Sequence, residues 1–328
     1  MKIGVCAWSF TGVHGQVGAA EDPHTPAGLV DLAIRHGLHS IEGASGWWDP
    51  QDKASLGDFR QRLADTHLGV FVDTGGHDYA QNIQPLRDAI GIAGNLGSKI
   101  VRTTISGLLE GDRRSLGADG WRAHLQGLVA PLTSVMQEAE ATGIDVGIEN
   151  HQDICSHELV WLCEQVGSPR LGVTMDVGNA YAVGETPLAF ARRVLPILKH
   201  VHLKDYTVHG SDAGFRLKRC ALGDGVVNWP EILELFSEHA PQVEGCIELG
   251  ATQARHIRLF EPDWWSTYPA RPFVPDALDA LGDLHRANTP NVDWRTPHEM
   301  DADETTRAQY EMQQFESSIS YLQEISAI

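Results

Sequence analysis

The sequence lacks the features that mark several common protein classes. Its five cysteines are odd in number and include no CxxC pair, which argues against a disulfide framework or a structural zinc knot. No apolar run approaches 18 residues, so no transmembrane helix is expected. The opening "MKIGVCAWSF" does not combine a basic segment with a long apolar one, as a secretory signal would. We therefore expect reduced thiols and a soluble, cytoplasmic protein.

Basic side chains are also scarce. The chain has 25 lysines and arginines against 44 aspartates and glutamates, which gives a formal net charge of −19. Such a charge repels nucleic acids and anionic membrane surfaces, so neither is expected as a partner. With 328 residues, of which 42% are hydrophobic, the chain can still bury a large core. Composition therefore indicates a globular enzyme or binding protein for small molecules.

Eight short apolar runs recur along the chain, each followed by a segment of helical periodicity. In order, they are "IGVCAW", "HSIEG", "GVFVDTGG", "KIVRTTI", "DVGIEN", "LGVTMD", "HVHLKD" and "GCIEL". This alternation predicts parallel pairing with right-handed crossovers, and hence a (β/α)₈ TIM barrel in one domain, residues 1–328. A doubly wound open sheet is the alternative, but the GxGxxG turn expected after its first strand is missing.

One segment departs from this rhythm. After the eighth apolar run, residues 251–302 form a long insertion rich in Trp, Pro and Arg, and a C-terminal helix follows in "TTRAQYEMQQFESSISYLQEI". Because the insertion leaves from the C-terminal mouth of the barrel, it is an elaborated loop that serves either as a lid or as an arm. Its aromatic and arginine content favours an arm that contacts another subunit, in a homo-oligomer or with a small partner.

Ionisable side chains close the last four predicted strands. In a barrel, the last inward residue of each strand lies at the mouth. The residues at these positions are Glu149, Asp176, His202 and Glu248. Three carboxylates this close cannot all stay ionised unless a cation lies among them. Ligands that are mostly oxygen with one nitrogen indicate a divalent metal, with Mn²⁺ as first choice and Mg²⁺, Co²⁺ or Fe²⁺ as alternatives.

These residues stand in motifs that resemble the xylose isomerase-like TIM barrel superfamily. The motifs are "IENH", "MDVGNA", "HVHLKD", "ALGDGVVNWPEIL" and "IELG". The resemblance covers about the first 250 residues and the last helix, and it implies that the same four residues bind the metal. It further implies that Glu149 and Glu248 transfer protons, as the paired glutamates of ketose epimerases do. Endonuclease IV, in the same superfamily, has a histidine where this chain has Asn179, so DNA repair is not expected.

A metal of this kind polarises a carbonyl and acidifies the neighbouring C–H bond. Glu149 and Glu248 are candidate bases, and His151 has the same strand parity as Glu149. His151 is therefore either a third base or a residue that orients Glu149. Lys204 shares the parity of His202 and either contacts an oxyanion of the substrate or pairs with Asp205.

Further substrate contacts are expected at the mouth. Glu42 closes the second apolar run and can accept hydrogen bonds from sugar hydroxyls, or else it caps the next turn. Trp47, next to Trp48, offers an indole face to a sugar ring. His77 follows the third run, where it can donate a hydrogen bond to the substrate or is simply solvated. Arg219 lies in the connection after the seventh run, where a basic residue often binds substrate oxygens in the family.

Two activities follow from these residues. The first is a divalent-metal sugar isomerase or epimerase that abstracts a proton next to the metal-bound carbonyl of a keto sugar. The second is a lyase that resembles the C-glycoside deglycosidase α subunits. That enzyme would eliminate the aglycone from a 3-oxo-C-glycoside, with His151 as the base, and residues 251–302 would contact a small subunit. A barrel that binds sugar without catalysis is the third alternative.

Overall fold

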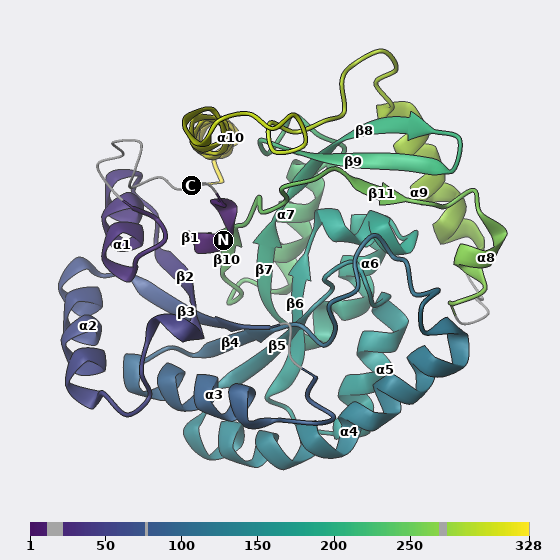
Figure 1. The fold of residues 1–328 in the computed structure, drawn as a ribbon. Coiled ribbons are helices and arrows are strands. Elements are labelled where there is room, and N and C mark those ends of the chain that lie inside the picture. The colour runs from purple at the N-terminus through teal and green to yellow at the C-terminus, as the bar shows by residue number, and fades with distance from the viewer. Residues whose placement is uncertain (12–21, 76–77, 269–273, 328) are drawn as a thin grey trace.

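The computed structural model describes residues 1–11, 22–75, 78–268 and 274–327, and eight parallel strands of this chain close into a barrel (Figure 1). The predicted fold class is therefore confirmed. Around the barrel the strands follow the order β1-β10-β7-β6-β5-β4-β3-β2. They are β1 (Ile3–Cys6), β2 (Ser40–Ala44), β3 (Gly69–Thr74), β4 (Ile100–Thr103), β5 (Asp145–Glu149), β6 (Leu171–Asp176), β7 (Leu198–Leu203) and β10 (Gly245–Ile247).

Helices cover the outside of the barrel (Figure 1). They are α1 (Pro26–Arg35), α2 (Lys53–Thr66), α3 (Gln84–Leu96), α4 (Gly117–Thr142), α5 (Ser156–Val166), α6 (Pro187–Val194) and α7 (Trp229–His239). Local sequence sets their ends. Thr25 accepts a hydrogen bond from the Gly28 amide to begin α1, and Gly143 ends α4 with a φ of 72°, a conformation that glycine adopts without strain.

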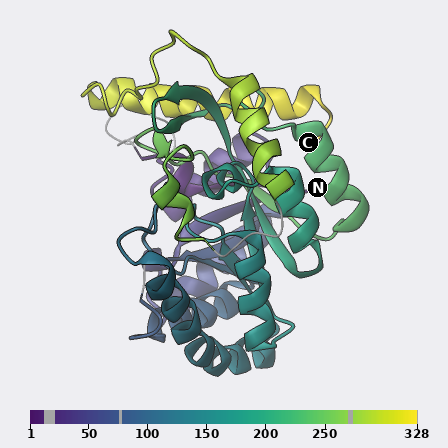
Figure 2. The ribbon, with the colours of Figure 1, turned by 90° about the vertical axis from the view of Figure 1, so that its right-hand side faces the viewer.

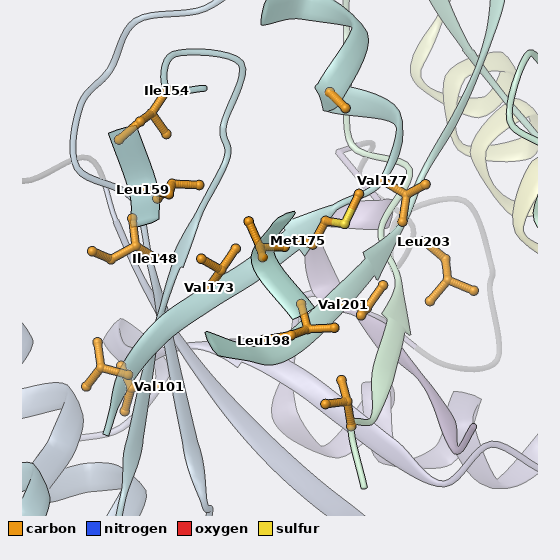
Figure 3. Packing of buried hydrophobic residues seen from close by; sticks show 14 of the residues in the cluster. Val101, Ile148, Ile154, Leu159, Val173, Met175, Val177, Leu198, Val201 and Leu203 are labelled. Carbon is orange, nitrogen blue, oxygen red and sulfur yellow. The ribbon is translucent and has the colours of Figure 1, made fainter. Parts of the chain in front are cut away.

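Alternate residues of each strand face the helices or the barrel interior. On the outer face, apolar side chains such as Ile148, Val173 and Val201 pack together in the main core (Figure 3). The interior holds a small separate apolar cluster of Cys6, Phe71, Ile100 and Cys246. Many other inward positions carry buried polar side chains, such as Asp73, Arg102 and Thr174. The interior of the barrel can therefore hold ionisable side chains.

A register shift between β6 and β7 sets the level of two strand ends. Val173 pairs with Leu198, but the next residue, Thr174, pairs with His200, so the ladder skips one residue of β7. Such irregularities re-aim side chains. As a result, Asp176 lies directly opposite His202, and both side chains point into the mouth of the barrel.

A second sheet stands at the mouth. It is antiparallel and contains β8 (Asp205–Ser211), β9 (Gly214–Cys220) and β11 (Arg255–Ile257), in the order β11-β9-β8. Only Lys204 separates β8 from the end of β7. The hairpin was not predicted from the sequence, which indicated an irregular connection there. Part of the insertion after the eighth barrel strand folds against this hairpin.

The rest of the insertion contains α8 (Pro262–Trp265) and α9 (Val274–Ala287), and α9 lies beside β8 (Figure 1). The C-terminal helix α10 (Glu304–Glu324) runs across the same end of the molecule (Figure 2). It is joined to β9 through Glu311 and Arg219 and to the loop after β1 through Thr11. All five cysteines are buried, and none forms a disulfide within the described residues. Among the described residues, no helix combines the length and apolar character needed to cross a membrane.

Candidate metal centre and substrate cavity

Three strand-end side chains converge at the mouth of the barrel. Glu149 of β5, Asp176 of β6 and His202 of β7 are fully buried, and one ligand atom from each lies within 4.8 Å of the other two. Glu149 Oε1, Asp176 Oδ1 and His202 Nδ1 have no hydrogen-bond partner within the described part of the chain. Leaving buried polar atoms unpaired costs free energy. A divalent cation fits this arrangement, because it would bind all three atoms at once.

Two buried basic side chains form ion pairs with these carboxylates and their neighbours. Arg102 of β4 forms ion pairs with Asp73 and Glu149. Lys204 lies 2.9 Å from Asp176 Oδ2 and also pairs with Glu248. The pairing of Lys204 with Asp205, considered from the sequence, is not formed, because the Asp205 carboxylate accepts hydrogen bonds from backbone amides and from the Trp229 indole.

The surroundings shift the pKa values of Glu149 and Asp176 in opposite directions. Burial alone would raise the pKa of Glu149, but Arg102 and the neighbouring His151, His202 and Lys204 outweigh it and lower the pKa to about 2. Burial raises the pKa of Asp176 to about 7 despite Lys204. Glu149 is therefore ionised at neutral pH, whereas Asp176 ionises fully only when further positive charge is near.

His202 is held from below by Glu42. Its Nε2 lies 2.8 Å and 3.0 Å from the two carboxylate oxygens of Glu42, which also bonds to His200 Nε2 at 3.1 Å. Burial opposes protonation of His202, but Glu42 outweighs it and raises the pKa to about 9. Since a carboxylate only accepts, Nε2 donates to Glu42. Nδ1 is 3.9 Å from Glu149; it carries the second proton of the imidazolium at neutral pH and would lose that proton when it binds a cation. Metal-binding histidines are commonly oriented in this way.

Replacing Glu42 with glutamine is expected to weaken Mn²⁺ binding about 10- to 100-fold, because a neutral amide orients His202 less firmly. Calorimetric titration with Mn²⁺ measures the effect. Glu185→Gln is the matched control, since Glu185 is equally buried but bonds to Ser156 and Arg193 instead. Unchanged Mn²⁺ affinity in the Glu42 variant would show that Glu42 has no part in the centre.

Among the described residues, two further groups could hold a metal, and both include Glu42. Cys6 joins Glu42 and His202, and Cys246 joins Glu42 and His200. Burial raises the pKa of both thiols well above its usual value, whereas the thiolate is the form that binds metals. Neither cysteine lines the cavity described next. The mouth group of Glu149, Asp176 and His202 is therefore the better centre.

A cavity of about 370 Å³ opens beside this centre. Its wall includes His151, Lys204 and Glu248 of the predicted site, and Arg102. Burial lowers the pKa of His151 to about 4, so its imidazole is neutral at neutral pH and can accept a proton. The Gly250 amide donates to Glu248 Oε1 at 3.0 Å, and a side chain at Gly250 would collide with that oxygen.

Three of the expected substrate contacts lie away from this cavity wall. Glu42 is two residues short of the end of β2 and fully buried. Trp47 packs edge-on against Trp48, with ring centroids 5.7 Å apart. Arg219 lies within β9, bonded to Gln314 and paired with Glu311 of α10. His77 lies outside the described residues.

Four charged or aromatic residues of the wall were not identified from the sequence. They are Trp8, Asp73, Arg102 and Arg255. Asp73 and Arg102 are inward residues near the ends of β3 and β4, and Trp8 follows β1, so strand parity could have found these three. Arg255 belongs to a strand that the sequence did not indicate.

Comparisons with known proteins agree with this architecture. Residues 30–261 match the family model of the xylose isomerase-like TIM barrel. The uncharacterized protein YihM of Escherichia coli (strain K12) is 26% identical over 229 residues, which are 66% of this chain and 65% of YihM.

A 3-oxo-isoapionate decarboxylase of Pectobacterium atrosepticum is 23% identical over 122 residues, 37% of this chain and 44% of that protein. The matched stretch is thus less than two thirds of the length of either curated relative. Among solved structures, D-psicose 3-epimerase of Clostridium cellulolyticum H10 with D-tagatose superposes with a TM-score of 0.57 and 14% identity. That match covers 88% of this chain and 99% of the epimerase. At this identity the likeness concerns the fold.

Proposed function

The chain belongs to the xylose isomerase-like TIM barrel family, and from that premise we propose that it is a metal-dependent sugar isomerase or epimerase. It would abstract a proton next to the carbonyl of a keto sugar. The observation that carries this proposal is the juxtaposition of the mouth group with a cavity that exposes a neutral histidine and a carboxylate.

Glu149, Asp176 and His202 would hold the divalent cation, with Glu248 as the fourth ligand implied by the family resemblance. Mn²⁺ is our first choice, because the set is rich in oxygen. When bound, the cation would polarise the substrate carbonyl and so acidify the neighbouring C–H bond.

His151 would take the proton. Its Nδ1 is buried without a hydrogen-bond partner among the described residues, and the ring lies on the cavity wall. Lys204 and Arg102 can then donate hydrogen bonds to the oxygen on which negative charge develops. Delivery of a different proton to the opposite face of the same carbon, for example by Glu248 after its carboxylate has gained a proton from solvent, gives an epimer, and His151 then releases its proton to solvent. Return of the abstracted proton by His151 to the neighbouring carbon gives an isomer.

The comparisons support chemistry of this kind. Their names include an epimerase that acts next to a ketose carbonyl and a decarboxylase of a 3-oxo acid. Both reactions pass through a negatively charged carbon next to a carbonyl. The same group of residues would stabilise either species.

A lyase is the second candidate, and the position of His151 favours it. Glu149 is fully buried and absent from the cavity wall, whereas His151 lies on it. If this one base removes a proton next to the carbonyl of a 3-oxo-C-glycoside, the resulting enolate would expel the aglycone, and the protonated His151 would return the proton to the leaving carbon. An epimerase needs a second proton carrier on the opposite face.

Incubation of Mn²⁺-loaded protein with ketoses and 3-oxo-C-glycosides in D₂O tests the proposal, with NMR as the readout. We expect deuterium to enter the carbon next to the carbonyl of at least one compound. Epimer formation would identify the first candidate, and release of aglycone the second. Stoichiometric Mn²⁺ with neither deuterium exchange nor aglycone release in any compound would contradict both and indicate a non-catalytic sugar-binding barrel.

A further inference from the structure

We infer that the substrate is a keto sugar acid whose carboxylate is bound by Arg255. This inference rests on the proposed function and adds the chemical class of its substrate. The observation behind it is a guanidinium on the cavity wall that has no acidic partner in the described part of the chain.

Arg255 stands on the inner face of the antiparallel sheet. It pairs with Leu217 of β9, and two residues later Ile257 pairs with Phe215. These three neighbours are buried and apolar. Side chains of one strand that share parity share a face, so Arg255 projects on the apolar side of the sheet, where the sheet borders the cavity. A charged group in such surroundings is costly without a partner.

The other cations near the cavity are already neutralised. Arg102 pairs with Asp73 and Glu149, and Lys204 pairs with Asp176 and Glu248. For Arg255, in contrast, no carboxylate of the described residues is an ion-pair partner, and its buried Nε makes no hydrogen bond there.

Two arginines close to Arg255 emphasise this difference. Arg219, inward on β9, is paired with Glu311. Arg258, three residues beyond Arg255, lies 3.2 Å from Glu110 Oε2 and 3.8 Å from Asp112 Oδ2. The charge of Arg255 therefore remains available for an anion that enters the cavity.

The backbone that carries Arg255 is fixed on both sides. The Ala254 amide donates to Glu299 at 3.1 Å, and the His256 amide donates to Glu110 at 3.1 Å. The Thr252 carbonyl accepts a hydrogen bond from the Thr296 hydroxyl. A guanidinium on a rigid support loses little freedom when it binds a planar carboxylate with two parallel hydrogen bonds.

The rest of the wall suits a polyhydroxylated carbon chain. Thr11, Thr104, Ser106 and Thr252 contribute hydroxyl groups, and Trp8 contributes an indole. A single guanidinium matches the charge of a carboxylate, whereas a phosphate dianion needs further donors. The anion is therefore assigned as a carboxylate.

Three probes that share one carbon skeleton test this assignment. D-Fructose is neutral, D-fructuronate carries a carboxylate at C6, and D-fructose 6-phosphate carries a phosphate there. Calorimetric titration of Mn²⁺-loaded protein is expected to show the tightest binding for D-fructuronate. The variant Arg255→Gln should weaken D-fructuronate binding about 10- to 100-fold, the range for a lost hydrogen-bonded charge partner, and leave D-fructose binding unchanged.

Arg258→Gln is the matched control and should preserve the preference, because Arg258 is already paired with acids. Thermal unfolding of both variants shows whether the fold is retained. Equal affinities for the acid and the neutral sugar, no binding of any probe, or Arg255-dependent binding of the phosphate alone would each overturn the inference. Deuterium exchange in D-fructose without acid preference would overturn it while leaving the proposed function intact.

Discussion

Replacing His151 with alanine is expected to lower kcat about 10²- to 10⁴-fold, the usual contribution of a positioned general base. The imidazole lies on the cavity wall, and burial keeps it neutral, with a pKa of about 4. Since His151 is not one of the atoms of the mouth group, Mn²⁺ should still bind stoichiometrically. Steady-state kinetics and elemental analysis of the same preparation measure the two quantities.

The control for this variant is His124→Ala. His124 is another partly buried histidine, but its Nε2 bonds to the Ile105 carbonyl and its ring is not on the cavity wall. We expect near-normal kcat from it. Full activity in His151→Ala would remove His151 as the base, and loss of Mn²⁺ together with activity would assign it a supporting role at the metal centre.

Replacing Asp176 with asparagine is expected to lower Mn²⁺ affinity more than about 100-fold, because removing a direct ligand should exceed the effect of removing a residue that orients one. The Asp176 carboxylate is fully buried. Lys204 and Asn179 both contact its Oδ2, whereas its Oδ1 has no hydrogen-bond partner among the described residues. Glu149→Gln should behave similarly. In the wild-type protein, Mn²⁺ should raise the Tm, and in these variants it should not.

Asp153→Asn is the matched control for the metal ligands. Asp153 is also fully buried, and burial raises its pKa to about 7, but it bonds to Ser106 and lies outside the mouth group. Its substitution should leave Mn²⁺ content unchanged. Stoichiometric Mn²⁺ in Asp176→Asn would show that Asp176 is not a ligand.

Strand parity accounts for what could be predicted from the sequence. A barrel strand presents every second residue inward, so the spacing of "GIENH" and "HVHLKD" was enough to place Glu149 and His202 on the same interior surface. The eight barrel strands were predicted from a different signal: buried parallel strands appear in a sequence as short apolar runs.

Depth along a strand and long-range partners could not be predicted in this way. Parity places Glu42 inside the barrel, but β2 continues to Ala44, so its carboxylate lies below the mouth, against His202. Arg219 is buried because Glu311 lies opposite it, 92 positions later in the chain. Similarly, β11 exists only because β9 offers it an edge, and its three residues carry no strand pattern of their own.

The central claim is that Glu149, Asp176 and His202 together bind a divalent cation. Anomalous diffraction at the manganese absorption edge, from crystals grown with Mn²⁺, tests it most directly. We predict one strong peak in contact with all three side chains, at about 2.0–2.3 Å from their ligand atoms. A peak beside Glu42 and the buried cysteines instead, or no peak at the mouth of the barrel, would contradict the account.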